Sequence, residues 1–241
     1  NWSYDMENPM SSYLVAFAVG DFSSKTITST NGIPLELYYP NGDTLLEEPT
    51  YRYSKQIFDF IENEIGYSYP WQNYKQVPLK DFMYAGMENT SATFFSDAFI
   101  VDSIGFIDRN YVNVNAHELA HQWFGNLVTM NWFNDVWMKE VFANFMAGKI
   151  INPLFKNINH ELQFLTSHYP SAYGVDRTLG SNPIRQELDN LERAGSLYGS
   201  IIYNKAPIMM RQLEQIIGEN YAHASKGCSR HQSRRIPQTR L

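Results

Sequence analysis

The sequence has a single cysteine, Cys228, so an internal disulfide is excluded and the redox compartment is left open. It also lacks long hydrophobic runs, because the longest, such as residues 13–19, are far too short to span a membrane. No signal peptide is visible after the first residue, Asn1. We therefore expect a fragment of a longer chain, for which cytoplasmic and periplasmic locations both stay open.

Basic residues are scarce outside the C-terminal end. The net charge is −6, but residues 219–241 hold five Lys or Arg and one acid, so the preceding 218 residues have a net charge of −10. An acidic body of this kind argues against nucleic acid as a partner. The aperiodic segment 219–241 is predicted to be a disordered or non-native tail. The remainder, in a chain that is 44% hydrophobic and 15% aromatic, can bury a real core.

The order of hydrophobic patterns predicts an α+β fold. Alternation predicts strands, and apolar residues at helical spacing predict helices. The expected strands cover residues 11–19, 33–39, 76–79 and 93–101, with turns at 23–32 and a linker at 47–49. The expected helices cover residues 51–65, 110–124, 136–150, 158–168, 187–198 and 206–217, with Gly66 ending the first and Pro207 in the first turn of the last.

The strongest motif is His117-Glu118-Leu119-Ala120-His121, an H-E-x-x-H. Two histidines four residues apart lie on one helix face and can reach one metal, while Glu118 can face the water on that metal as a general base. Glu140 follows nineteen residues later in an apolar helix, where a carboxylate is costly unless it is paired or metal-bound. The motif predicts one Zn²⁺ held by His117, His121 and Glu140. The alternative is that both histidines are ordinary half-buried helix residues.

These residues resemble the M1 family of zinc aminopeptidases, or gluzincins, of bacterial type. HELAHQWFGNLVT at 117–129, WMKE at 137–140 and AGMEN at 85–89 carry the resemblance, which runs from about residue 11 to 217. It implies a thermolysin-like catalytic domain preceded by a β-rich saddle domain. Residues 1–46 are then the last strands of the saddle, and residues 47–218 are an incomplete catalytic domain.

The resemblance also implies roles for single residues. Glu88 would bind the free α-ammonium of the substrate, and the hydroxyl of Tyr203 would stabilise the oxyanion. Tyr203 could instead be a packing residue on a helix. The backbone beside Glu88 would approach the substrate as an edge strand, which makes the further substrate-binding candidates Ala85, Gly86, Met87 and Asn89.

The sequence departs from the family pattern at three positions. Ala85 stands where the family motif begins with Gly, and it is strained only if that position needs a positive φ. Lys139 and Val141 flank Glu140 where Asn and Gly are common, and we expect altered packing with the metal retained. Asn144, one turn after Glu140, either hydrogen-bonds near the metal ligands or lies on the helix surface.

The resulting hypothesis is a zinc-dependent aminopeptidase that hydrolyses the N-terminal peptide bond of peptides with a free N-terminus. Three alternatives remain. The scaffold could serve another zinc hydrolase, such as an endopeptidase or an epoxide hydrolase. The chain could be an inactive relative that binds peptide N-termini, or an incomplete product without a stable fold. The preferred N-terminal residue and the oligomeric state are outside what the sequence determines.

Overall fold

The computed structural model describes residues 5–42, 44–100 and 109–218, and its sheet has five strands in the order β1-β2-β3-β5-β4. The strands are β1 (Phe22–Thr28), β2 (Pro34–Pro40), β3 (Tyr74–Leu79), β4 (Gly86–Met87) and β5 (Ala92–Ser96). The pairs β1–β2 and β4–β5 are antiparallel, whereas β2–β3 and β3–β5 are parallel. Among the described residues, β4 therefore forms one edge of the sheet, with one side of its backbone not paired to another strand.

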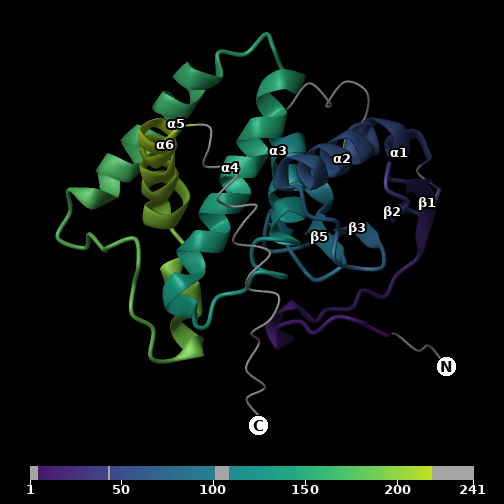
Figure 1. Ribbon diagram of the computed structural model, residues 1–241. Coiled ribbons are helices and arrows are strands. Elements are labelled where there is room, and N and C mark those ends of the chain that lie inside the picture. Colours follow the sequence, from purple (N-terminus) through teal and green to yellow (C-terminus); the bar gives the residue numbers. More distant parts are fainter. Residues whose placement is uncertain (1–4, 43, 101–108, 219–241) are drawn as a thin grey trace.

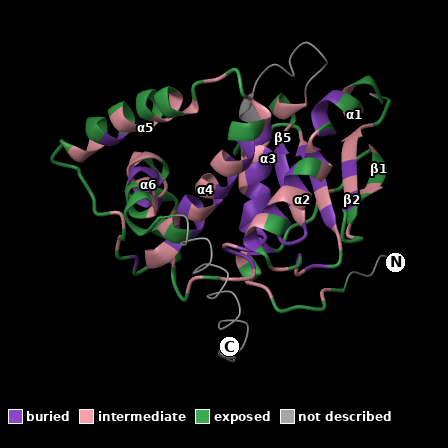
Figure 2. Ribbon diagram, turned by 45° about the horizontal axis from the view of Figure 1, so that its top comes forward, coloured by how far each residue is buried: buried purple, intermediate pink, exposed green. Residues whose placement is uncertain are grey.

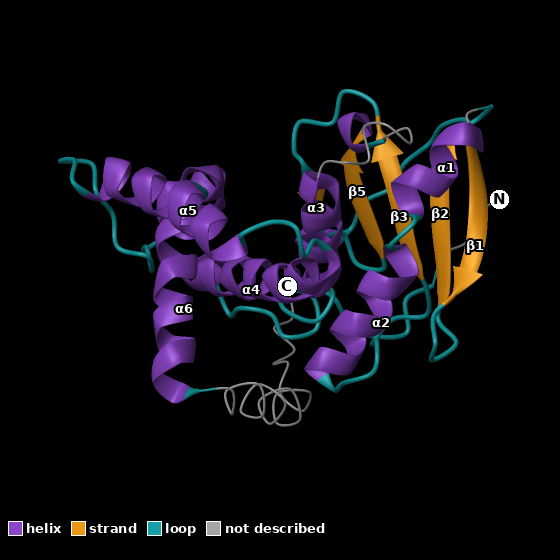
Figure 3. Cartoon of the chain, turned by 90° about the horizontal axis from the view of Figure 1, so that it is seen from above, coloured by secondary structure: helices purple, strands orange, loops and turns teal. Residues whose placement is uncertain are grey.

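The first α-helices along the chain pack against the sheet, and the later ones extend away from it (Figure 3). The helices are α1 (Thr44–Tyr51), α2 (Ser54–Ile65), α3 (Arg109–His121), α4 (Val136–Leu154), α5 (His160–Asp176) and α6 (Ala206–Ile217). Short 3₁₀ turns cover Ser12–Leu14, Asp97–Phe99, Phe133–Asp135 and Leu191–Leu197, and a π-helical turn covers Ile201–Lys205. α3 and α4 lie side by side between the sheet and the α5–α6 pair (Figures 1 and 3). None of the helices in the described ranges combines the length and apolarity needed to cross a bilayer.

The main core lies between α2, α3 and the sheet (Figure 2). Ile57, Phe58 and Ile61 of α2 are fully buried because their spacing places them on one helix face. The Phe58 ring lies 4.9 Å from that of Tyr69, and the Tyr69 ring lies 5.3 Å from that of Trp123. Each such side chain contributes roughly 1.5–3 kcal/mol by burial, so the core anchors the C-terminal end of α3.

Several expectations from the pattern are confirmed. β2 and β3 lie where alternation places strands, and α3, α4 and α6 lie where helical spacing places helices. Gly66 ends α2 with φ of 67°, a left-handed conformation that glycine adopts without strain. Pro207 lies in the first turn of α6, as predicted, directly after the π-helical turn.

Other expectations are wrong. The alternating stretch 11–19 forms only the short turn Ser12–Leu14, and no strand in the described part of the chain pairs with it. Phe17 and Val19 are accordingly 88% and 92% exposed. Part of the expected turn at 23–32 is instead β1, because pairing with β2 outweighs its polar composition. The expected linker 47–49 lies inside α1, and most of the expected helix 187–198 is a 3₁₀ turn.

β1 and β2 share one sheet with β3, β4 and β5. The boundary expected between residues 46 and 47 therefore runs between neighbouring strands of a single sheet, and in the described structure it does not separate two sheets. The tail expected at residues 219–241 lies outside the described residues.

Candidate active site

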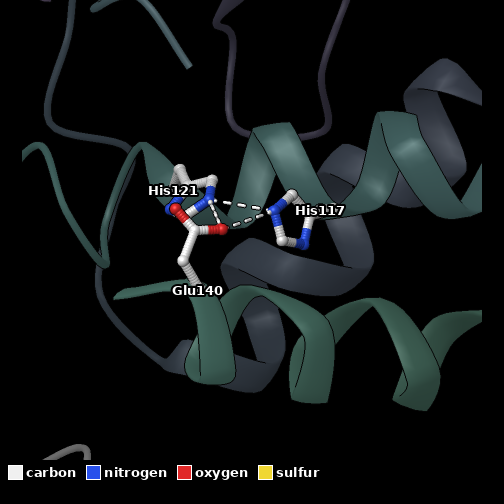
Figure 4. Close-up of side chains that lie close together, drawn as sticks. All are labelled: His117, His121 and Glu140. Atoms are coloured by element: carbon white, nitrogen blue, oxygen red, sulfur yellow. Dashed lines mark hydrogen bonds and ion pairs between the residues drawn. The ribbon is translucent and has the colours of Figure 1, made fainter. Parts of the chain in front are cut away.

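Two imidazoles and one carboxylate converge where α3 packs against α4. His117 and His121 project from α3, and their Nε2 atoms are 3.0 Å apart. Glu140 projects from α4, with its Oε2 atom 3.2 Å from His117 Nε2 and 3.5 Å from His121 Nε2 (Figure 4). The structure thus brings together the three residues that the sequence predicts as metal ligands.

The other ring nitrogen of each histidine has its own partner. His121 Nδ1 lies 2.9 Å from the backbone carbonyl of Phe124, which can only accept, so Nδ1 is the donor. His117 Nδ1 lies 3.1 Å from Asn144 Oδ1, which likewise accepts in this amide orientation. Neutral imidazoles held in this way direct both Nε2 lone pairs toward each other and toward the Glu140 carboxylate. A cation at the centre would resolve that repulsion, so the three side chains form a group that could hold a metal ion.

The charges around the cluster favour a cation as well. Burial raises the pKa of Glu140, but the two histidines and Lys139 outweigh it, so the pKa lies well below its usual value and the carboxylate stays ionised. Burial lowers the pKa of His121, but Glu88 and Glu140 raise it above its usual value. Positive charge at His121 Nε2 is therefore stabilised, and a bound metal ion would supply it.

Glu118 lies beside this cluster and is buried. Burial raises its pKa to about 8, helped by Glu88 and Glu140 and opposed by His117. One ligand atom each from Glu88, Glu118 and His121 lie within 4.8 Å of one another, so a second set of donors exists. The set of His117, His121 and Glu140 is the one that the H-E-x-x-H motif predicts, and it offers two histidine nitrogens where the second set offers one.

Gly86, on the edge strand β4, lies directly against the side chain of Glu118. A Cβ atom built on Gly86 would lie 2.5 Å from Glu118 Oε1, so no larger residue fits without moving that carboxylate. Gly86 pairs with Phe95 on β5, and the neighbouring Ala85 carbonyl accepts a bond from Ser96 N at 3.2 Å. Among the described residues, positive φ outside glycine occurs only at Asp81 and Ser91, so Ala85 is not strained.

Glu88 follows β4 in a turn that is hydrogen-bonded to residues just after the C-terminal end of α3. Gln122 Oε1 accepts from Ser91 N at 2.9 Å, and Gln122 Nε2 donates to Asn89 O at 3.2 Å. Asn126 Nδ2 donates to Glu88 O at 2.8 Å. The segment that carries Glu88 is therefore tied directly to the helix that carries the histidines.

The other predicted site residues are not part of the group formed by His117, His121 and Glu140. Asn89 donates its amide to Leu14 O at 3.1 Å, so its side chain serves the fold. Met87 pairs with Phe94 on β5. Tyr203 lies on the π-helical turn, with its ring 6.3 Å from that of Tyr198. Burial and the negative charge of Glu140 raise the pKa of Tyr203, so its hydroxyl keeps its proton.

Three contributors were not predicted as site residues. Gln122 and Asn126 orient the Glu88 turn, and Lys139 forms ion pairs with Glu88 and, at 3.3 Å, with Glu140 Oε1. The available signal for Gln122 was its position directly after the H-E-x-x-H motif, where it is fully buried. For Lys139 the signal was its departure from the family pattern, but its partner Glu88 lies 51 residues earlier.

The peptidase family M1 domain matches residues 50–231 of this chain. The chain is 34% identical over 214 residues to the puromycin-sensitive aminopeptidase of Caenorhabditis elegans. The aligned region covers 87% of this chain and 23% of the relative. It is 33% identical to aminopeptidase N of Lactobacillus helveticus, over 88% of this chain and 26% of the relative. It is 30% identical to human glutamyl aminopeptidase, over 94% of this chain and 24% of the relative. The chain thus spans about a quarter of the length of these relatives.

Proposed function

The chain belongs to peptidase family M1, and from that premise we propose that it is the catalytic core of a zinc-dependent aminopeptidase. The observation that carries the proposal is the convergence of two imidazole nitrogens and one carboxylate oxygen beside the buried carboxylate of Glu118. Three similar proteins are named aminopeptidases, which supports the same activity. The substrates we propose are peptides with a free amino terminus.

The donor set fits zinc. Two histidine nitrogens and one glutamate oxygen are a common ligand set of catalytic zinc, which keeps a fourth position open for water or substrate. Zinc bound by His117, His121 and Glu140 would act as a Lewis acid and lower the pKa of a water molecule to about 7. Asn144 and the Phe124 carbonyl hold the two imidazoles in the tautomer that such a metal needs.

Glu118 is proposed as the general base. Its carboxylate accepts a proton from the attacking water and passes it to the leaving amine. Burial makes this carboxylate more basic than an exposed one, since its pKa is raised to about 8. The backbone of Gly86 closes one side of Glu118, which limits the positions that the carboxylate can occupy.

The substrate is proposed to run along β4. An extended peptide can pair with the free edge of a sheet, and β4 is the edge strand beside Glu118. The hydroxyl of Tyr203, protonated because its pKa is raised, would donate a hydrogen bond to the oxyanion. Glu88 would face the substrate ammonium. With Glu118 on the metal-binding helix, this layout supports the thermolysin-like arrangement that the resemblance implies.

The test is Glu118→Gln, which removes the base and keeps the shape of the side chain. We expect metal content to stay the same and kcat to fall by about 10²–10⁴-fold. Metal content is measured by mass spectrometry. Turnover is measured with a panel of amino-acid nitroanilides that differ in their side chains, so that the test does not depend on which N-terminal residue the enzyme prefers. The control is Glu64→Gln, which breaks only the ion pair between Glu64 on α2 and Lys149, at 2.8 Å.

A Glu118→Gln variant that binds metal and keeps more than a tenth of the activity would remove Glu118 from the mechanism. Hydrolysis of amino-terminally blocked peptides at a rate above that of free ones would instead favour an endopeptidase on the same scaffold.

A further inference from the structure

Lys139 is a buried cation in the middle of the site. Its side chain is only 5% exposed, and its ammonium pairs with Glu88 Oε1. It also lies 3.3 Å from Glu140 Oε1. The ammonium lies 5.3 Å from the centre of the Tyr13 ring and 5.9 Å from that of Tyr198. Two carboxylates and two aromatic faces therefore surround it, each of which attracts a cation.

The stem of Lys139 is confined too. Gly125 has φ of +131°, and a Cβ atom on it would lie 3.2 Å from Lys139 Cδ, so the loop after α3 approaches the lysine stem closely. For the ammonium to leave Glu88, it would have to give up its ion pairs without solvent to replace them. Breaking a buried pair in this way is strongly unfavourable.

The position of this ammonium matters because of what Glu88 is proposed to bind. The α-ammonium of a peptide and the ammonium of lysine are chemically alike, and both need a carboxylate partner in a buried site. The Glu88 carboxylate, however, is already paired with the buried ammonium of Lys139. A substrate ammonium would then enter a site in which its own partner is taken.

On the proposed function we therefore infer that Lys139 is a specificity-determining residue that occupies the ammonium-binding carboxylate of Glu88 from within the chain. It weakens the recognition of a free amino terminus and relaxes the requirement for one. Peptides whose amino terminus is blocked or distant from the scissile bond then compete better than they would beside an unpaired Glu88.

The test is Lys139→Asn in the zinc-loaded protein, compared with Lys149→Asn on the same helix. Lys149 pairs with Glu64 at 2.8 Å and provides the matched loss of a paired lysine. We expect Lys139→Asn to raise kcat/KM for free amino-acid nitroanilides by roughly 10–100-fold, mainly through KM, as one restored charge-assisted hydrogen bond predicts. The N-acetylated nitroanilides should change little, and Lys149→Asn should change neither.

A second arm measures binding without turnover. Calorimetry with leucinol, an amino alcohol with no bond to hydrolyse, should show tighter binding to Lys139→Asn than to the unaltered protein, and N-acetyl-leucinol should not. Adding Glu88→Gln to Lys139→Asn should abolish the gain. Lys139→Arg keeps a cation and should behave like the unaltered protein. Lys139→Met keeps the apolar stem without the charge, so it takes the place of Lys139→Asn in both measurements if the Asn variant folds poorly.

The kinetic and calorimetric measurements distinguish a failure of the proposed activity from a failure of the proposed role of Lys139. If no variant hydrolyses any nitroanilide, the proposed activity fails, and the leucinol affinities still decide the role of Lys139. Equal gains for free and acetylated ligands, or no gain for the free amine in Lys139→Asn, would overturn the inference.

Discussion

Replacing Gly86 with alanine should disable Glu118 while leaving the metal ligands in place. Gly86 has an ordinary negative φ, so the backbone accepts alanine and the effect arises from space alone. The new Cβ would lie 2.5 Å from Glu118 Oε1, 2.6 Å from Cγ and 2.7 Å from Cδ. All three atoms are on one side chain, so relief of the overlap requires the whole carboxylate to move.

The size of the effect follows from those distances. Carbon atoms in contact are about 3.5–4.0 Å apart, so the Glu118 side chain must shift by about 1 Å. A displacement of that size at a reacting group can cost about 10²-fold in rate. Overpacking a buried position costs about 1–3 kcal/mol of stability, which leaves a folded protein. We therefore expect kcat for amino-acid nitroanilides to fall about 100-fold in Gly86→Ala, with metal content unchanged.

The control is Gly148→Ala in α4, where an added Cβ meets no atom within 4 Å. This change should leave kcat unaltered and raise stability by up to about 1 kcal/mol, since alanine is the better helix former. Glu118→Gln should cost much less in the Gly86→Ala background than alone, because the base is already displaced. A Gly86→Ala variant with kcat within twofold of the unaltered protein, or one that loses metal, would refute the reasoning.

Two further changes test the support of the site. Asn144→Leu removes the acceptor for His117 Nδ1 and should weaken metal binding about 10–100-fold, measured by competition with a chromophoric chelator; unchanged affinity would show that Asn144 does not orient the imidazole. Gln122→Met leaves Ser91 N and Asn89 O without their partner and should lower the free energy of unfolding by about 2–4 kcal/mol in urea titrations; a loss under 1 kcal/mol would mean that the turn finds other partners.

The sequence by itself determined the candidate metal-ligand set, because the geometry of that set is largely local. His117 and His121 are one helical turn apart, so any helix over the motif aligns their side chains. Glu140 needs only a second helix packed on the first, and α4 supplies it. The helices were predictable for a similar reason, since a spacing of three and four residues reports one buried face.

What only the tertiary structure decided depends on partners that are distant in sequence. β1 is a strand because β2 pairs with it, and the stretch 11–19 is not, because none of the described strands pairs with it. Lys139 reads as a minor departure from a family pattern until the fold brings it against Glu88, 51 residues earlier. The role of a buried charge depends on the charge that neutralises it, and tertiary packing determines which group that is.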